Sequence, residues 1–223
     1  MDAFSTRVFG GNQAGVALPE RELPDARMQQ VAAEFKHSET AFVRVEGDGS
    51  VTLRYFTPAG EVELCGHATV ASFALLRQLG RIGDGDVTAH TKAGELSVTV
   101  QGGTVWMDMA KPQLLRELGE DEWDAFYEAY GLTAADRPEG LTPAIVSTGL
   151  ADVMLPVRDH DTLMRAVQNE AAVTALSKQY DVTGVHMFCL GDGCTAYCSN
   201  YAPLYDIPEE CATGTSNGAL TYY

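Results

Sequence analysis

The sequence predicts a fold that mixes strands and helices and is built from two similar halves. The same order of elements (strands, a helix, a hairpin and a cysteine-containing turn) is predicted twice along the chain. Around the two turns, an aromatic strand end is followed by a proline, an acidic stretch, Cys65 or Cys211, and small residues. This recurrence indicates an internal repeat. With 223 residues, 45% of them hydrophobic, the chain can bury a core in one or two domains.

The first half is predicted from apolar periodicity and turn residues. Apolar residues at helical spacing predict helices, alternation predicts strands, and Gly-Gly between two alternating runs predicts a hairpin. The expected elements are a Gly-rich loop at 10–15, a short strand at 16–18, a helix at 25–37, strands at 41–45 and 51–55, a helix at 66–79, and a hairpin of 95–100 with 104–109.

The second half is predicted in the same way. Its expected elements are a linker at 112–120, a short aromatic helix ended by Gly131, strands at 144–148 and 153–157, a helical stretch at 159–178 broken near Asn169, a hairpin of 185–190 with 195–201, and a helix that starts after Cys211.

Charge and composition exclude several classes of function. A formal net charge of −16 argues against nucleic-acid or anionic-membrane binding, both of which need a basic surface. No run of about 20 apolar residues predicts a membrane span, and the N-terminus lacks a signal pattern. We therefore expect a cytoplasmic protein whose five cysteines are thiols.

Two cysteines at predicted helix starts suggest proton-transfer chemistry. Backbone N–H groups at a helix start can bind a carboxylate and the enolate formed beside it, which makes Gly66, Gly214 and Thr215 candidate substrate-binding residues. A thiol at such a position has a lowered pKa, so Cys65 and Cys211 could remove and return a proton on opposite faces of a carbon atom. The alternative is that both are small buried apolar residues.

Three further residues are candidates for the same site. Glu39, between a helix and an apolar strand, could be a general acid or base, or only a surface turn residue. His67 could bind a substrate carboxylate or a neighbouring base, or only make a local bond at the helix start. Asn12, in the Gly-rich loop, could bind substrate, although the loop does not match a nucleotide-binding fingerprint.

A metal centre is not expected. The spacing of Cys189, Cys194 and Cys198 matches no zinc knuckle, so these residues are expected to pack in a hairpin or core. The sequence also contains no phosphate-binding loop and no nucleophilic serine elbow.

The motifs taken together resemble the phenazine-biosynthesis PhzF-like family of the diaminopimelate epimerase-like superfamily. They run Phe9-Gly10-Gly11-Asn12-Gln13-Ala14-Gly15-Val16, Ser38-Glu39-Thr40, Phe56-Thr57-Pro58, Cys65-Gly66-His67-Ala68-Thr69 and Pro208-Glu209-Glu210-Cys211-Ala212-Thr213-Gly214-Thr215. The resemblance implies an α+β fold of two pseudo-symmetric halves, each a curved, mostly antiparallel sheet wrapped around a central helix. We expect the halves at 1–111 and 112–223, with further C-terminal residues missing after Tyr223.

The resemblance also implies an activity, namely cofactor-independent isomerisation or epimerisation of a small carboxylic or amino acid in a cleft between the halves of a homodimer subunit. Glu39 matches the family's proton shuttle and His67 its motif histidine, while Glu210 stands where an aspartate is usual. Cys65 and Cys211 match the catalytic cysteines of diaminopimelate epimerases, so Glu39 and the thiol pair remain two versions of the mechanism. A non-catalytic protein that binds small acids is the alternative function.

Overall fold

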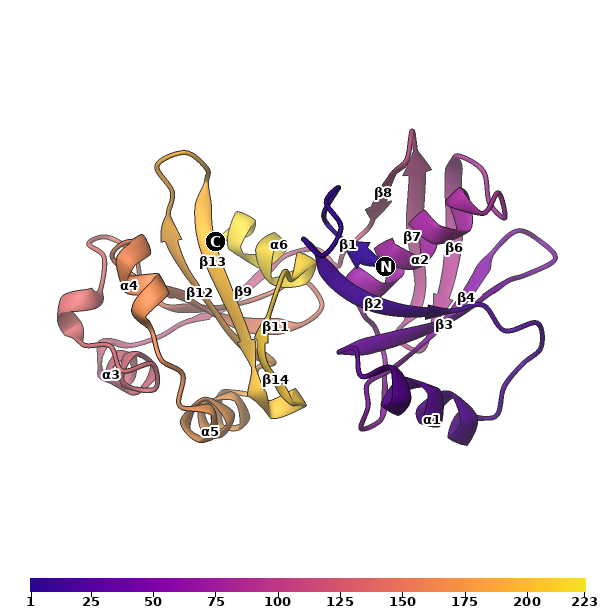
Figure 1. Cartoon of the computed structure of the whole chain (residues 1–223). Helices are drawn as coiled ribbons and strands as arrows, with labels where there is room; N and C mark the ends of the chain where they lie inside the picture. Colours follow the sequence, from indigo (N-terminus) through magenta and orange to yellow (C-terminus); the bar gives the residue numbers. More distant parts are fainter. The chain divides into compact units, whose positions relative to one another are not determined.

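The computed structural model describes residues 1–223 as two compact units, Met1–Met109 and Ala110–Tyr223. Each unit has its own β-sheet (Figure 1). Each also has its own hydrophobic core. Both sheets mix parallel and antiparallel pairs, and helices pack against them, which confirms the predicted α+β class. No helix of the structure is both long and apolar enough to cross a membrane.

The first unit is an eight-stranded sheet with two helices. Its strands follow the order β1-β2-β3-β4-β6-β7-β8, and β5 pairs with β4. The pairs β2–β3 and β4–β6 are parallel, and the others are antiparallel. The elements are β1 (Asp2–Ala3), β2 (Asn12–Ala17), α1 (Asp25–Phe35), β3 (Glu39–Val45), β4 (Val51–Phe56), β5 (Glu61–Val62), α2 (Gly66–Gln78), β6 (Gly85–Thr91), β7 (Gly94–Gln101) and β8 (Thr104–Met107).

The two faces of this sheet hold different helices. Residues that alternate along β4, such as Leu53 and Tyr55, point into the core that surrounds α2. Phe42 and Phe56 belong to a separate cluster with Met28 of α1. Helix α2 contacts β1, β2, β3, β7 and β8, so the sheet wraps around it, as the resemblance implies. The buried position of α2 places the residues at its start inside the first unit.

The second unit is a six-stranded sheet with four α-helices. Its strand order is β14-β13-β12-β11-β10-β9, in which only β11–β12 is parallel. The elements are β9 (Gln113–Glu117), α3 (Glu120–Glu128), β10 (Ala144–Ser147), β11 (Ala151–Pro156), α4 (His160–Arg165), α5 (Glu170–Tyr180), β12 (Gly184–Leu190), β13 (Ala196–Ala202), β14 (Ile207–Glu210) and α6 (Gly214–Tyr222), with short 3₁₀ turns at Ala134–Asp136 and Pro203–Tyr205.

Alternation along β11 again separates two cores. Val153 and Leu155 belong to the cluster that α3, α4 and α5 cover. Met154 belongs to the opposite cluster, with Ala219 of α6. Helix α6 therefore covers one face of the sheet and the other helices cover the opposite face.

Most elements with strong periodicity are confirmed. Helices α1 and α2, both hairpins and the break at Asn169 are found within a few residues of their predicted bounds. Asn169 is the N-cap of α5, and its side chain accepts a hydrogen bond from Ala172 N–H. The second helix therefore begins directly after Asn169.

Two predictions about irregular segments are wrong. The predicted linker at 112–120 contains strand β9, whose residues are all exposed and so show no alternation. The predicted loop at 10–15 overlaps β2, which starts at Asn12. Gly15 is needed in that strand because a Cβ atom there would lie 2.5 Å from Thr40 Oγ1. Strands β5, β6 and β14 have no counterpart among the predicted elements.

Candidate active site

The start of α2 carries two of the predicted site residues. Cys65 is the N-cap, with an extended backbone (φ −141°, ψ 111°), and Gly66 and His67 are the first helical residues. The Cys65 carbonyl accepts hydrogen bonds from Thr69 N–H (3.0 Å) and Thr69 Oγ1 (2.7 Å). The Thr69 hydroxyl also lies 2.6 Å from the buried Tyr55 hydroxyl of β4. These contacts fix the turn to the sheet and so hold Cys65 and His67 in place.

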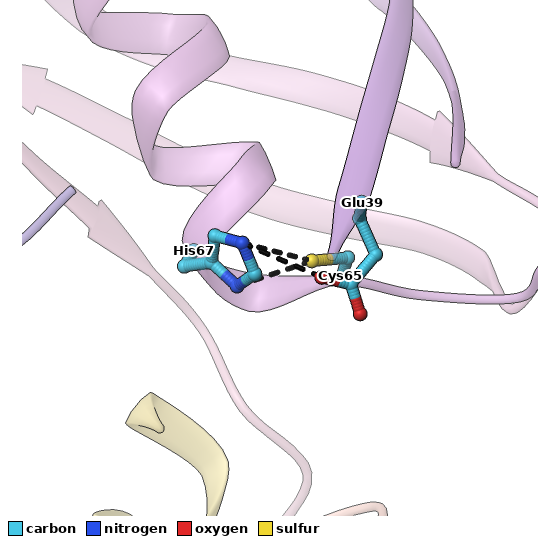
Figure 2. Close-up of side chains that lie close together, drawn as sticks. All are labelled: Glu39, Cys65 and His67. Carbon is cyan, nitrogen blue, oxygen red and sulfur yellow. Dashed lines mark hydrogen bonds and ion pairs between the residues drawn. The ribbon is translucent and has the colours of Figure 1, made fainter. Parts of the chain in front are cut away.

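Glu39, Cys65 and His67 form one buried cluster (Figure 2). Cys65 Sγ lies 3.4 Å from His67 Nδ1 and 4.0 Å from His67 Nε2. His67 Nε2 in turn lies 3.5 Å from Glu39 Oε2. Glu39 is the first residue of β3, so a strand start and a helix start bring the three groups together.

Burial sets the electrostatics of the cluster. Glu39 is only 8% exposed, so the alternative of a surface turn residue is wrong. Its Oε2 atom is buried without a hydrogen-bond partner, because the 3.5 Å approach of His67 lacks hydrogen-bond geometry. Burial lowers the pKa of His67, and the Glu39 carboxylate and a backbone hydrogen bond with Gln13 oppose this shift only in part. His67 is therefore neutral at neutral pH.

The other predicted residues of the first unit lie beside the cluster. Asn12 is buried in β2, where it pairs with Ala3, and its neighbour Gln13 is the residue that bonds His67. The backbone hydrogen bond with Gln13 joins the start of α2 to β2, so the contacts of His67 extend beyond its own helix turn. Gly66 has room at its Cα, since a Cβ atom would meet only Met107 Cε at 3.6 Å.

The structure places Cys211 differently from the prediction. Helix α6 begins at Gly214 with Thr213 as its N-cap, so Cys211 lies in the bend before the helix start. It is exposed, whereas Cys65 is buried. The helix expected after Cys211 is present, but Ala212 and Thr213 separate this cysteine from the first helical residue, whereas Cys65 directly precedes its helix.

The remaining predicted residues of the second unit surround this bend. Glu210 is the last residue of β14 and is half-buried. Gly214 is exposed in the first turn of α6. The backbone carbonyl of Thr215 accepts a hydrogen bond from Thr148 Oγ1 at 2.9 Å.

Two buried polar pairs of the second unit were not predicted from the sequence. Ser216 Oγ donates to Asp152 Oδ2 at 2.5 Å, and His186 Nδ1 lies 3.0 Å from Asn200 Oδ1. Burial raises the pKa of Asp152 to about 6, although hydrogen bonds from Ser216 and from the backbone of Gly184 oppose the shift. An aspartate within the apolar run of β11 was the available signal.

Known proteins resemble the chain over nearly its whole length. The model of the PhzC-PhzF family, described as phenazine biosynthesis-like protein, matches residues 1–223. The uncharacterized isomerase YddE of Escherichia coli O157:H7 is 33% identical over 225 residues, which cover 99% of this chain and 76% of the relative. An uncharacterized isomerase of Deinococcus radiodurans is 35% identical over 223 residues, covering 98% of this chain and 72% of the relative.

Solved structures give the same result. A PhzF-family phenazine biosynthesis protein from Bacillus anthracis is 28% identical with a TM-score of 0.89, covering 99% of this chain and 76% of that chain. A structure from Pseudomonas aeruginosa, named as a predicted epimerase, is 28% identical with a TM-score of 0.79. The match covers 100% of this chain and 78% of that chain. A probable proline racemase from Agrobacterium radiobacter K84 shares the fold alone. It is 11% identical with a TM-score of 0.58, and the match covers 92% of this chain and 72% of that chain.

Proposed function

The chain belongs to the PhzC-PhzF family of phenazine biosynthesis-like proteins and is an isomerase, and we propose that it moves a proton on carbon beside the carboxylate of a small organic acid, with Glu39 as the base. The observation that carries the proposal is the buried Glu39 carboxylate, whose Oε2 atom has no hydrogen-bond partner and lies 3.5 Å from His67 Nε2. An oxygen that no donor engages keeps its lone pairs for a substrate proton.

His67 is the second group of the proposed mechanism. Because burial keeps the imidazole neutral, it can donate a hydrogen bond from one ring nitrogen and accept one at the other. Its Nδ1 atom is in contact with Cys65 Sγ, which leaves Nε2 facing Glu39. With its proton on Nδ1, His67 would therefore accept a hydrogen bond at Nε2 from the carboxyl group once Glu39 has taken the proton from carbon.

Substrate binding is proposed for the amide donors of the first helical turn. Helix α2 has 13 residues, and the N–H groups at its start lack intrahelical partners. The N–H group of Gly66 would bind the substrate carboxylate and the negative charge that develops on it when the neighbouring carbon loses its proton. Asn12, Glu210, Gly214 and Thr215 remain predicted substrate contacts. The proposed reaction transfers only protons, so the chain's own groups suffice for it.

The two-thiol mechanism remains a separate prediction. It requires Cys65 and Cys211 to exchange protons with opposite faces of the substrate carbon. We prefer Glu39 because its carboxylate is buried and lacks a hydrogen bond on one oxygen, whereas Cys211 is exposed outside its helix. Single variants of these residues separate the two mechanisms.

Solvent deuterium exchange tests the proposal. Small amino, hydroxy and unsaturated acids are incubated with the protein in D₂O with a chelator present, and deuterium on carbon is followed by NMR. We expect exchange in one class of acid, reduced by a factor of about 10² to 10⁴ in Glu39→Gln. Glu34→Gln, an exposed carboxylate on α1, is the matched control and should keep the wild-type rate.

Three outcomes would contradict the proposal. Full exchange in Glu39→Gln would exclude Glu39 as the base. If Cys65→Ser and Cys211→Ser abolished exchange while Glu39→Gln retained it, the two-thiol mechanism would be correct. Binding of acids without exchange in any of them would indicate the non-catalytic alternative.

A further inference from the structure

The cluster of Glu39, Cys65 and His67 has the donor set of a transition-metal site. It combines a thiol, an imidazole and a carboxylate, the three side-chain types that bind zinc in proteins. The candidate ligand atoms all lie within 4.8 Å of one another, and all three residues are buried. It is the only group of three such side chains that the structure brings together, and the hairpin cysteines 189, 194 and 198 form none.

The distances already approach those of a tetrahedral ion. Zinc binds sulfur at about 2.3 Å and nitrogen or oxygen at about 2.0–2.2 Å, which separates neighbouring donors by roughly 3.4–3.6 Å. His67 Nε2 lies 3.5 Å from Glu39 Oε2 and 4.0 Å from Cys65 Sγ. Figure 2 shows the three side chains converging from β3 and from the start of α2. The separation of Cys65 Sγ and Glu39 Oε2 is within 4.8 Å, so side-chain rotations that bring the donors closer would complete the three bonds.

The surroundings favour a cation between these groups. Glu39 Oε2 is buried without a hydrogen bond, so no hydrogen bond replaces those that this oxygen would make with water. An ion bound to Oε2 would supply the missing compensation. Cys65 would lose its thiol proton to solvent on binding, since the thiolate is the metal ligand.

The geometry points to a specific inhibitory site: one Zn²⁺ ion held by Glu39 Oε2, Cys65 Sγ and His67 Nε2, with water in the fourth position. The bound ion would occupy the lone pairs that the proposed base and its partner need. Zinc would therefore inhibit proton transfer reversibly. This inhibition rests on the proposed function, whereas the binding itself does not.

Cobalt is the spectroscopic probe for binding. The full chain is treated with a chelator under reducing conditions and titrated with Co²⁺. We expect one equivalent to produce a thiolate-to-cobalt charge-transfer band together with the intense visible bands of a four-coordinate ion, and Zn²⁺ to displace it. Absence of both bands in the wild-type protein would overturn the proposal.

Variants assign the ligands. Cys65→Ser should lose the charge-transfer band, and Glu39→Gln and His67→Gln should each weaken Co²⁺ binding at least tenfold. Cys194→Ser, an exposed thiol of the second unit, is the matched control and should bind as the wild type does. A band that persists in Cys65→Ser would overturn the site. Circular dichroism identifies any variant that fails to fold, and Glu39→Gln, which preserves shape, then decides the assignment.

Exchange measurements keep this proposal distinct from the proposed function. Deuterium exchange in the presence of a chelator tests the isomerase mechanism alone, and the cobalt spectrum without substrate tests the metal site alone. If both hold, Zn²⁺ should abolish exchange and the chelator should restore it. Full exchange at saturating Zn²⁺ would contradict the inhibitory role.

Discussion

Thr213 occupies the backbone position in the second unit that Cys65 occupies in the first. Each is the N-cap of a helix, has an extended backbone (φ −125°, ψ 109° for Thr213 and φ −141°, ψ 111° for Cys65) and precedes a glycine at the first helical position. Neither side chain caps its helix with a hydrogen bond. The equivalent residues of the two units are therefore a thiol and a hydroxyl, and Cys211 lies outside this correspondence.

Thiol reactivity should differ sharply between Cys65 and Cys211. Cys211 and Cys194 are exposed, whereas Cys65 and Cys189 are buried, so a maleimide should modify the first two rapidly and the last two only after local opening. Peptide mapping by mass spectrometry after timed quenching measures the rates. All five cysteines should react alike in denaturant. Equal native rates for Cys65 and Cys211 would contradict the burial of Cys65.

The stability of the protein should fall below about pH 6.5 through His67. Its pKa is lowered from 6.5 in the folded state, so the unfolded chain binds more protons as the pH falls, and the free energy of unfolding decreases until the folded pKa is passed. His67→Gln removes this dependence. Urea unfolding of both proteins at pH 7.5 and below measures it, and the difference between them should shrink in acid. Parallel curves would show that His67 titrates normally.

Asp152 should make the protein less stable as the pH rises, which is opposite to the effect of His67. Its pKa is raised from 3.8 to about 6, so the folded state binds more protons between these values and stability is lost as the pH rises through them. The shift corresponds to on the order of 3 kcal/mol. Relative to Asp152→Asn, the wild type should lose up to about this amount between pH 4 and pH 7 in urea unfolding. Asp161→Asn, an exposed control, should follow the wild type.

Gly184 should tolerate no side chain. A Cβ atom there would lie 1.9 Å from the carbonyl oxygen of Tyr201 on the neighbouring strand, and backbone cannot move aside as a side chain can. Gly184→Ala should therefore destabilise the protein by about 3 kcal/mol or prevent folding. Gly47→Ala, with nothing within 4 Å, is the control and should change stability by less than about 0.5 kcal/mol. Similar melting temperatures for the two variants would contradict the close approach of β12 and β13.

The candidate site could be predicted only where local sequence determines it. Cys65 and His67 are two residues apart at a helix start, so their contact follows from the motif itself. The approach of Glu39 to His67 depends on how β3 lies beside β2 and α2, which no short motif encodes. The exact start of α6, two residues beyond Cys211, was likewise not predictable from the motif, because packing sets where a helix begins.

The elements of the fold were also predictable only where local sequence determines them. Helices α1 and α2 and both hairpins have apolar periodicity or turn residues that reveal them. Strand β9 has five exposed residues and is held by backbone pairing to β10, so its side chains carry no signal. The hydrogen bond between Ser216 and Asp152 joins residues far apart in the chain. Only the packing of α6 against β11 brings them together.

Helix α2 contains His67 and is also the central helix of its unit. Its buried residues extend along the helix to Leu76. Substitutions that would reshape specificity at its first turns therefore also strain the interior around them. Random libraries aimed at this helix should return mainly misfolded clones. A change of substrate preference should therefore start from a variant stabilised elsewhere in the chain. The added stability would offset the loss that substitutions in α2 cause.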